Sequence, residues 1–376
     1  MATALKNQFG AEVVQRIAAM LAAVAPQFDA AAFSADALQG YEALELLARA
    51  RQITRVLRRH LPADAAQAIE LLLASLGPKL ARSDAPGMAP FLYLPHVYFV
   101  AEHGLDHFEL AMRAQHELTQ RFTAEFSIRA FLERHPQATL ARLRQWAVDP
   151  SEHVRRLVSE GTRPRLPWAP RLRAFQRDPQ PVLALLELLK DDPSPYVRRS
   201  VANNLNDIGK DHPALLVEVA QRWLQDAPPP RRQLLRHALR SAIKRADPAA
   251  LALFGAADAA EVGVEAVSLT PRQPQIGAAL QVALTLRNPT SQPQRVLADL
   301  RLHYARPGGR TAPKVFKLRL LDLAPGQAVA LAKRITLADL TTRRHYPGVH
   351  QVELLLNGRA LPLGGFELLP ARPDRA

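Results

Sequence analysis

Three consecutive stretches in the middle of the chain decide the fold: TLARLRQWAVDPSEHVRRLVSEGTR (139–163), PVLALLELLKDDPSPYVRRSVANNLNDIGKD (181–211) and ALLVEVAQRWLQDAPPPRRQLLRHALRSAIKRAD (214–247). Each contains a helix with apolar periodicity, a short turn with Asp and Pro, and a second helix with paired arginines near its start. The turn residues Asp149 and Asp192 are 43 residues apart, and Asp192 and Asp226 are 34 apart. This spacing and unit are typical of HEAT-like repeats, so we predict an α-solenoid.

The segments on either side of the repeats differ in their periodicity. Residues 1–255 have the three- and four-residue spacing of helices, and residues 1–90 are expected to form an N-terminal helical cap without site residues. After residue 255 the chain contains six or seven short, often alternating runs, such as ALQVALTLRN (279–288), separated by turn sequences such as NPTSQP. We therefore predict that a β-sandwich over residues 261–370 follows the helices.

Composition and charge limit the function. Zero cysteines exclude a disulfide scaffold, a thiolate metal site and a Cys nucleophile. No apolar run reaches the roughly 18 residues of a membrane-spanning helix, so we expect a cytoplasmic protein with no membrane contact. The net charge of +14 is uneven: residues 1–120 carry −2, residues 121–245 carry +10 and residues 261–376 carry +8. A nucleic acid or a membrane surface could attract such charge.

The second helices of the repeats present charge on one side. In residues 196–210, one arc holds Val197, Val201, Leu205 and Ile208, and another holds Arg199, Asn203, Asp207 and Lys210. In the preceding repeat, Val154, Leu157 and Val158 face the core, while Arg156 and Glu160 lie on the other side. Single arginines of this kind usually belong to a solvated face. Their recurrence in the segment with +10 favours a surface that follows a phosphate backbone.

Acidic and aromatic side chains stand out within this basic segment. Glu125 with Arg129, Glu160 with Arg156 and Asp207 with Lys210 have the spacing of ordinary ion pairs within a helix. Together, however, acids repel phosphate, so their presence suggests a different task, such as stabilising positive charge on a substrate. Trp146 and Trp223 lie in periodic helices and are expected in the core. Trp168, between two prolines, is either packed or an exposed stacking plane.

Three blocks carry a resemblance to a known family: FVAEHGLDHFELAMRAQHELTQRFTAEFSIRAFL (99–132), HVRRLVSEGTRPRLPWAPRL (153–172) and SPYVRRSVANNLNDIGKDHP (194–213). They resemble the AlkC branch of the bacterial AlkC/AlkD-type DNA glycosylases. The resemblance covers most of the chain, because AlkC-type proteins also carry an immunoglobulin-like C-terminal domain. It implies an enzyme that excises cationic N-alkylated bases, such as 3-methyladenine and 3-methylcytosine, from duplex DNA without a metal, a cofactor or deep base flipping.

The resemblance also implies site residues. The expected pocket residues are Glu125, Glu160, Trp168 and Asp207. The residues that we expect at DNA phosphates are Arg129, Arg155, Arg156, Arg163, Arg198, Arg199, Asn203 and Lys210 in the helices, and Lys314, Lys317, Arg343 and Arg344 in the β domain. The basic residues of the β domain either contact DNA or form a solvated face.

One alternative function remains open at the level of sequence. A HEAT-repeat protein without catalytic activity could bind nucleic acid or serve as a scaffold, with the immunoglobulin-like domain as an adaptor. Neutral substitutions of Asp207 and Glu160 distinguish the glycosylase from the non-catalytic protein, because a protein that only binds nucleic acid should tolerate them. We expect a monomer with no obligate protein partner.

Overall fold

The computed structural model describes residues 5–80, 89–245, 247–253, 261–340 and 343–371. The chain divides into two compact units, one of Met1–Leu216 with Arg222–Ala238 and one of Val217–Gln221 with Leu239–Ala376. The predicted boundary was residue 255, where the sequence periodicity changes. The division into compact units lies earlier in the chain, after Ala238. The first unit is helical, and the second contains all the described strands.

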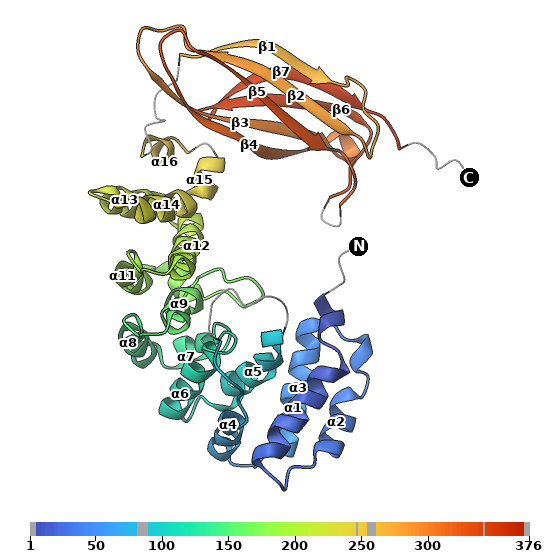
Figure 1. Ribbon diagram of the computed structural model, residues 1–376, viewed down its shortest axis with the longest axis vertical. Coiled ribbons are helices and arrows are strands. Elements are labelled where there is room, and N and C mark those ends of the chain that lie inside the picture. Colours follow the sequence, from blue (N-terminus) through green and yellow to red (C-terminus); the bar gives the residue numbers. More distant parts are fainter. Residues whose placement is uncertain (1–4, 81–88, 246, 254–260, 341–342, 372–376) are drawn as a thin grey trace. The chain divides into compact units, whose positions relative to one another are not determined.

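The helices of the first unit follow one another along the chain (Figure 1). They are α1 (Ala11–Val24), α2 (Ala30–Leu38), α3 (Leu46–His60), α4 (Ala65–Ala74), α5 (Leu94–His103), α6 (Phe108–Thr119), α7 (Ile128–Arg134), α8 (Pro136–Trp146), α9 (Glu152–Gly161), α10 (Arg173–Arg177), α11 (Gln180–Leu189), α12 (Pro195–Asp211), α13 (Pro213–Leu224) and α14 (Pro229–Ala238). Figure 1 shows α8, α11 and α13 in one row and α9, α12 and α14 in another, as helix pairs in a solenoid do.

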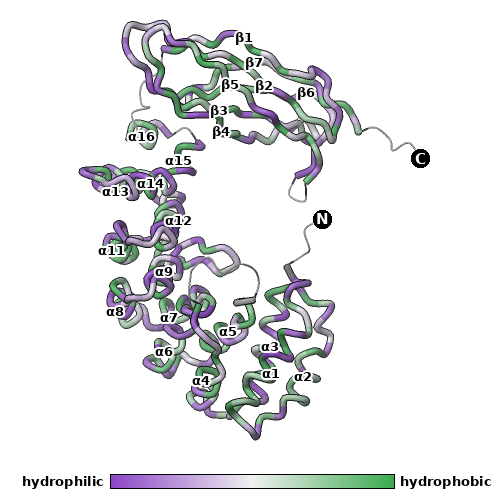
Figure 2. Tube along the Cα trace, in the orientation of Figure 1, coloured by the Kyte–Doolittle hydropathy of each residue, from purple (hydrophilic) through white to green (hydrophobic). Residues whose placement is uncertain are grey.

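The repeat helices form for the reasons that their sequence indicates. Pro195 opens α12, where the missing N–H is no loss, and the predicted apolar stripe of Val197, Val201, Leu205 and Ile208 is buried. Helix α12 packs against both α9 and α14, the second helices of the neighbouring repeats. Figure 2 shows hydrophobic residues recurring between hydrophilic ones along these helices. The prediction of helical repeats is confirmed.

The turns within the repeats share one hydrogen-bond pattern. The carboxylates of Asp149 and Asp192 each accept a hydrogen bond, at 2.8 Å, from the backbone N–H two residues later. Arg155 donates to the carbonyls of Asp149 and Pro150, and Arg198 donates in the same way to the carbonyls of Asp192 and Pro193. In these two repeats the first arginine of the pair therefore closes the turn that precedes its own helix, whereas in the third repeat the second arginine, Arg232, donates to the carbonyl of Ala227.

The second unit contains residues Val217–Gln221 of α13, two short helices and a sandwich of two antiparallel sheets. Its helices are α15 (Arg240–Lys244) and α16 (Pro248–Ala252). One sheet has the order β1-β2-β5 and the other β4-β3-β6-β7. The strands are β1 (Gly263–Thr270), β2 (Ala279–Arg287), β3 (Gln294–Ala305), β4 (Thr311–Leu323), β5 (Ala328–Thr336), β6 (Gly348–Leu356) and β7 (Arg359–Leu368).

The core of the sandwich follows from alternation along its strands. In β2, Leu280, Val282, Leu284 and Leu286 are buried, as expected when every second side chain faces the opposite sheet. They pack with residues of the other sheet such as Leu300. The predicted β-sandwich after the helices is confirmed. Within the described residues, no helix is both long and apolar enough to cross a membrane.

Candidate functional site

A cavity of about 400 Å³ lies in the helical unit beside α9 and α12. It is lined by side chains from these helices, from the loop after α9 and from segments that precede α5 and α7: Leu80, Phe91, Phe122, Thr123, Glu125, Phe126, His153, Arg156, Glu160, Arg163, Leu166, Pro167, Trp168 and Tyr196. Three of the four expected pocket residues are therefore brought together in one lining. The fourth, Asp207, joins them through Arg163.

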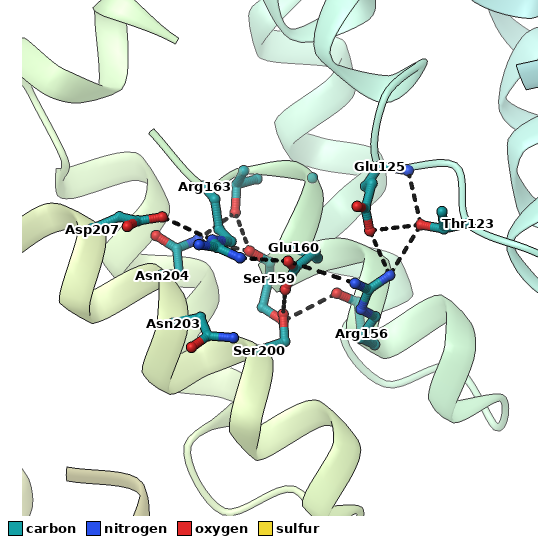
Figure 3. A network of polar contacts seen from close by, with 12 residues as sticks. Thr123, Glu125, Arg156, Ser159, Glu160, Arg163, Ser200, Asn203, Asn204 and Asp207 are labelled. Atoms are coloured by element: carbon teal, nitrogen blue, oxygen red, sulfur yellow. Dashed lines mark hydrogen bonds and ion pairs between the residues drawn. The ribbon is translucent and has the colours of Figure 1, made fainter. Parts of the chain in front are cut away.

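Arg163 links two buried carboxylates from successive repeats (Figure 3). Its Nη1 lies 2.6 Å from Oε1 of Glu160, and its Nε lies 2.8 Å from Oδ2 of Asp207. Glu160 is 6% exposed and Asp207 only 1%. Lys210 adds a second cation to Asp207, with its Nζ 2.8 Å from Oδ1. The sequence places these acids on the side of their helices away from the core, but the loop after α9 and the adjacent repeat cover them.

Arg156 forms the second centre of the network. Its Nη1 lies 2.6 Å from Oε2 of Glu125, and its Nη2 lies 3.6 Å from Oε1 of Glu160. Its guanidinium also lies over the ring of Tyr196, 5.3 Å from the centroid, and Thr123 donates a 2.8 Å hydrogen bond to Glu125. The expected ion pair of Glu125 with Arg129 is wrong, because the partner of Glu125 comes from the next repeat helix.

The charges of this network balance. Glu125, Glu160 and Asp207 supply three negative charges, and Arg156, Arg163 and Lys210 supply three positive ones. Burial by itself would raise the pKa of Glu160, but Arg156, Arg163 and the Ser200 hydroxyl outweigh burial and hold that pKa below its ordinary value. Glu160 is therefore ionised at neutral pH, although it is buried.

A second layer of buried hydrogen bonds orients Glu160. The Ser200 hydroxyl of α12 donates to Oε2 of Glu160 at 2.6 Å, and the Ser159 hydroxyl donates to Ser200 at 2.7 Å. The amide of Asn204 donates to the Ser159 carbonyl and to the Thr162 hydroxyl, at 2.8 and 3.0 Å. Because these bonds connect α9 with α12, the position of Glu160 depends on the packing of two repeats.

Trp168 lies on the irregular segment between α9 and α10, which comprises residues 162–172. Its side chain is 55% exposed and its φ of 64° lies in the left-handed region, which is unusual for a residue with a Cβ. The ring of Trp168 is therefore exposed and not packed in the core, and its role as a stacking plane stays a prediction. Trp146 and Trp223 are buried, as predicted.

Several arginines expected at phosphates are engaged within the protein. Arg129 is buried and donates to backbone carbonyls. Arg156 and Arg163 pair with the carboxylates of the network, and Arg155 also pairs with Asp192 of the next repeat, Nε to Oδ2 at 2.6 Å. Their guanidinium groups hold carboxylates and turns, so they are poorly placed for phosphate.

The remaining expected contacts of the helical unit are more accessible. Arg199 is exposed, and no hydrogen bond or ion pair of its side chain is seen among the described residues. Lys210 is exposed but pairs with Asp207, and Oδ1 of Asn203 lies 3.0 Å from Nε2 of His237. Arg198 is partly buried and uses one nitrogen for its turn.

The four expected residues of the β domain differ in exposure. Lys317 and Arg344 are exposed, whereas Lys314 lies over the Phe316 ring and Arg343 over the Tyr304 ring, 4.9 and 5.2 Å from the centroids. Lys314 and Lys317 are three residues apart in β4, so they point to opposite faces of the strand. Arg343 follows Thr341 and Thr342, which lie outside the described residues.

Sequence reasoning missed the aromatic part of the lining. Phe91, Phe122, Phe126 and Tyr196 form this part, and Leu80 contributes from the first 90 residues, where we expected no site residue. The N–H of Leu80 donates to the carbonyl of Gln120 at 2.8 Å, and this bond holds the segment beside the cavity. The signal in the sequence was the aromatic pair flanking Glu125 in FTAEF (122–126).

His153 also lines the cavity without having been predicted. Its Nε2 is buried without a hydrogen-bond partner among the described residues, and its ring meets the Tyr196 ring edge-on at 5.9 Å between centroids. Burial lowers the pKa of His153, which keeps the imidazole neutral at pH 7. No group of three or more His, Cys, Asp or Glu side chains among the described residues could hold a metal ion.

Comparisons with known proteins agree along the whole chain. The family model described as "DNA alkylation repair enzyme" matches residues 118–246, and the model of the YhaZ C-terminal Ig-like domain matches residues 263–370. Uncharacterized protein YhaZ of Bacillus subtilis is 33% identical over 94% of this chain and 96% of its own. The solved structure of Pseudomonas fluorescens alkylpurine DNA glycosylase AlkC, bound to DNA containing an abasic site analog, is 39% identical with a TM-score of 0.89. The match covers 97% of this chain and 99% of that one.

Proposed function

The chain belongs to the AlkC family of DNA alkylation repair proteins, and from this premise we propose that it is a monofunctional DNA glycosylase. Its substrate would be duplex DNA that carries cationic N-alkylated bases, with 3-methyladenine and 3-methylcytosine as the main lesions. The observation that carries the proposal is the pair of buried acids, Glu160 and Asp207, held by one arginine at the edge of a cavity.

The reaction suits these residues. A base alkylated at a ring nitrogen already carries a positive charge, so the electron pair of the bond to C1′ can move onto the base, which leaves as a neutral molecule. The positive charge then moves to the deoxyribose, and water attacks C1′ and gives up a proton. An ionised carboxylate can stabilise the oxocarbenium-like state and accept that proton. General acid catalysis is not required for this leaving group.

The roles divide among the four pocket residues. Glu160 and Asp207 stabilise the deoxyribose cation and orient the water, and Glu125 contributes a third negative charge farther along the cavity. The exposed Trp168 ring offers a cation–π face to the alkylated base, worth about 0.5–2 kcal/mol. Because its ring stands at the surface, the lesion can be approached in the duplex without being swung deep into the protein.

The arginines of the network have a different role from those that bind DNA. Arg156 and Arg163 hold the carboxylates in place and keep Glu160 ionised, and so act as positioning residues. The exposed side chains of Arg199 and Lys210 in the helices and of Lys317 and Arg344 in the β domain are the better phosphate contacts.

The experiment that tests the proposal measures free base. Duplex DNA treated with a methylating agent is incubated with the protein, and the released bases are separated by chromatography. Release of 3-methyladenine or 3-methylcytosine above the spontaneous rate is expected. DNA binding without any release would instead identify a non-catalytic repeat protein.

A further inference from the structure

Arg129 on α7 is a buried cation whose hydrogen bonds go to backbone carbonyls. It is 4% exposed. Its Nη1 donates to the carbonyls of Gly161 and Arg163 at 3.1 and 2.7 Å, and its Nη2 donates to that of Pro170 at 2.5 Å. The acceptors therefore lie at the end of α9 and on both sides of Trp168.

The segment that Arg129 holds has few backbone hydrogen bonds of its own, although Arg163 and Arg165 tie its first half to Asp207 and Asp211 by ion pairs. Residues 162–172 form neither helix nor strand, and Pro164, Pro167 and Pro170 have no N–H to donate. Within the segment, the described backbone bonds are those from Ala169 to Leu166 and from Leu172 to Pro164, at 3.4 and 3.2 Å. The left-handed φ of Trp168 adds a local conformational cost that its surroundings must offset.

More than half of the surface of the Trp168 side chain faces solvent, so packing of this ring contributes little to holding the segment in place. Leu166 is buried in the cavity wall before Trp168 and Leu172 is buried at the end of the segment, but none of residues 167–171 between them is buried. The guanidinium of Arg129 reaches both sides, and its fork geometry suits three acceptors that a Lys ammonium could not match in the same plane.

Keeping a cation in this place is costly. Burial lowers the pKa of Arg129 to about 10, while the charges of Glu133, Glu125 and Asp207 act in the opposite direction. The described hydrogen-bond partners of Arg129 are backbone carbonyls and include no carboxylate. The energetic cost of burying the cation is therefore offset by bonds that fix the backbone of residues 161–170.

We propose that Arg129 is a positioning residue, which sets Trp168 and the backbone of Arg163 against the cavity and contacts neither lesion nor phosphate. The expected effect on kcat rests on the proposed glycosylase function. The expected effect on the position of Trp168 does not depend on activity. It replaces the phosphate contact that the sequence suggested for Arg129.

The test compares Arg129→Lys with Arg49→Lys. Arg49 is a matched control, since it is 6% exposed and also donates to backbone carbonyls, those of Lys6, Phe9, Glu42 and Leu44, none of which lines the cavity. Iodide quenching of tryptophan fluorescence reports mainly on Trp168, because Trp146 and Trp223 are buried. The Trp168→Phe variant supplies the background signal.

We expect both Lys variants to melt at lower temperature, but only Arg129→Lys to change the quenching constant of Trp168. Well below the melting temperature, kcat for base release should fall about 10- to 100-fold in Arg129→Lys, with the salt dependence of DNA binding unchanged. Arg49→Lys should keep the wild-type kcat.

Two results would overturn the proposal. If quenching and kcat are those of wild type in Arg129→Lys, the residue is structural only; if the salt slope of binding falls by about one, it contacts a phosphate. If the wild-type protein also releases no base but Arg129→Lys changes the quenching constant, the positioning role of Arg129 stands and the glycosylase function is refuted.

Discussion

Replacing Arg163 by Gln tests whether the two central carboxylates depend on one shared cation. The substitution removes the contacts of 2.6 Å to Glu160 and 2.8 Å to Asp207, and both acids are buried. Breaking a buried ion pair by removing one partner costs about 3–5 kcal/mol, because it leaves charge buried without compensation. For a unit of this size that corresponds to a fall of roughly 6–20 °C in melting temperature.

The pH dependence of this loss has a definite sign. The pKa of folded Glu160 lies below its ordinary value, so its ionisation stabilises the wild type above that ordinary value and ceases to do so as pH falls through the folded pKa. Without Arg163, the pKa of Glu160 rises and this contribution shrinks. The gap in stability between wild type and variant should therefore be widest near neutral pH and narrow below about pH 4.5.

Far-UV circular dichroism melts at several pH values measure this gap. Arg165→Gln is the control, since Arg165 lies on the same segment, pairs with Asp211 in a more exposed setting, and should cost no more than about 1 kcal/mol. Asp207→Asn in the Arg163→Gln background should add little, because the buried carboxylate it removes retains only the ion pair with the exposed Lys210 among the described residues. Equal losses in the two arginine variants, or a gap independent of pH, would show that Glu160 and Asp207 do not depend on Arg163.

Three further predictions concern single residues. Trp168→Ala should slow excision roughly 2- to 30-fold at unchanged melting temperature, and an unaltered kcat would remove the ring from the site. His96 is fully buried without hydrogen-bond partners among the described residues, and burial lowers its pKa to about 4. Because unfolded His96 binds a proton more readily, the free energy of unfolding should fall by about 3 kcal/mol as pH falls from 6.5 towards 4. His96→Leu should flatten this part of the plot of melting temperature against pH, and a plot identical to that of wild type would contradict the lowered pKa of His96. Arg199→Ala should lower the salt slope of duplex binding by about one in a titration series, whereas an unchanged slope would exclude a phosphate contact.

The fold was largely predictable because its elements leave local patterns. The apolar stripe of Val197, Val201, Leu205 and Ile208 and the alternation along β2 each follow from one helix or one strand, and both are buried as predicted. The position at which compact units divide, near Ala238, depends on packing between elements and leaves no local pattern.

The acids of the candidate site and two of their partners within one helix, Arg156 for Glu160 and Lys210 for Asp207, were predictable, but the contacts between repeats were not. Spacing within a helix suggested Arg129 for Glu125, yet Arg156 takes that place, and Arg163 reaches Asp207 across 44 residues. Contacts between repeats depend on the stacking of helices, which spacing within one helix does not encode. The same holds for Leu80, which a backbone hydrogen bond brings to the cavity.

Release of free base from alkylated duplex DNA by wild type, Glu160→Gln and Asp207→Asn tests the central claim most directly. The wild type should release 3-methyladenine or 3-methylcytosine, and each neutral variant should be slower by about 10²- to 10³-fold while binding undamaged duplex as tightly or more tightly. Absence of release by the folded wild type, or the full rate in both variants, would contradict the claim that these buried carboxylates carry out the chemistry.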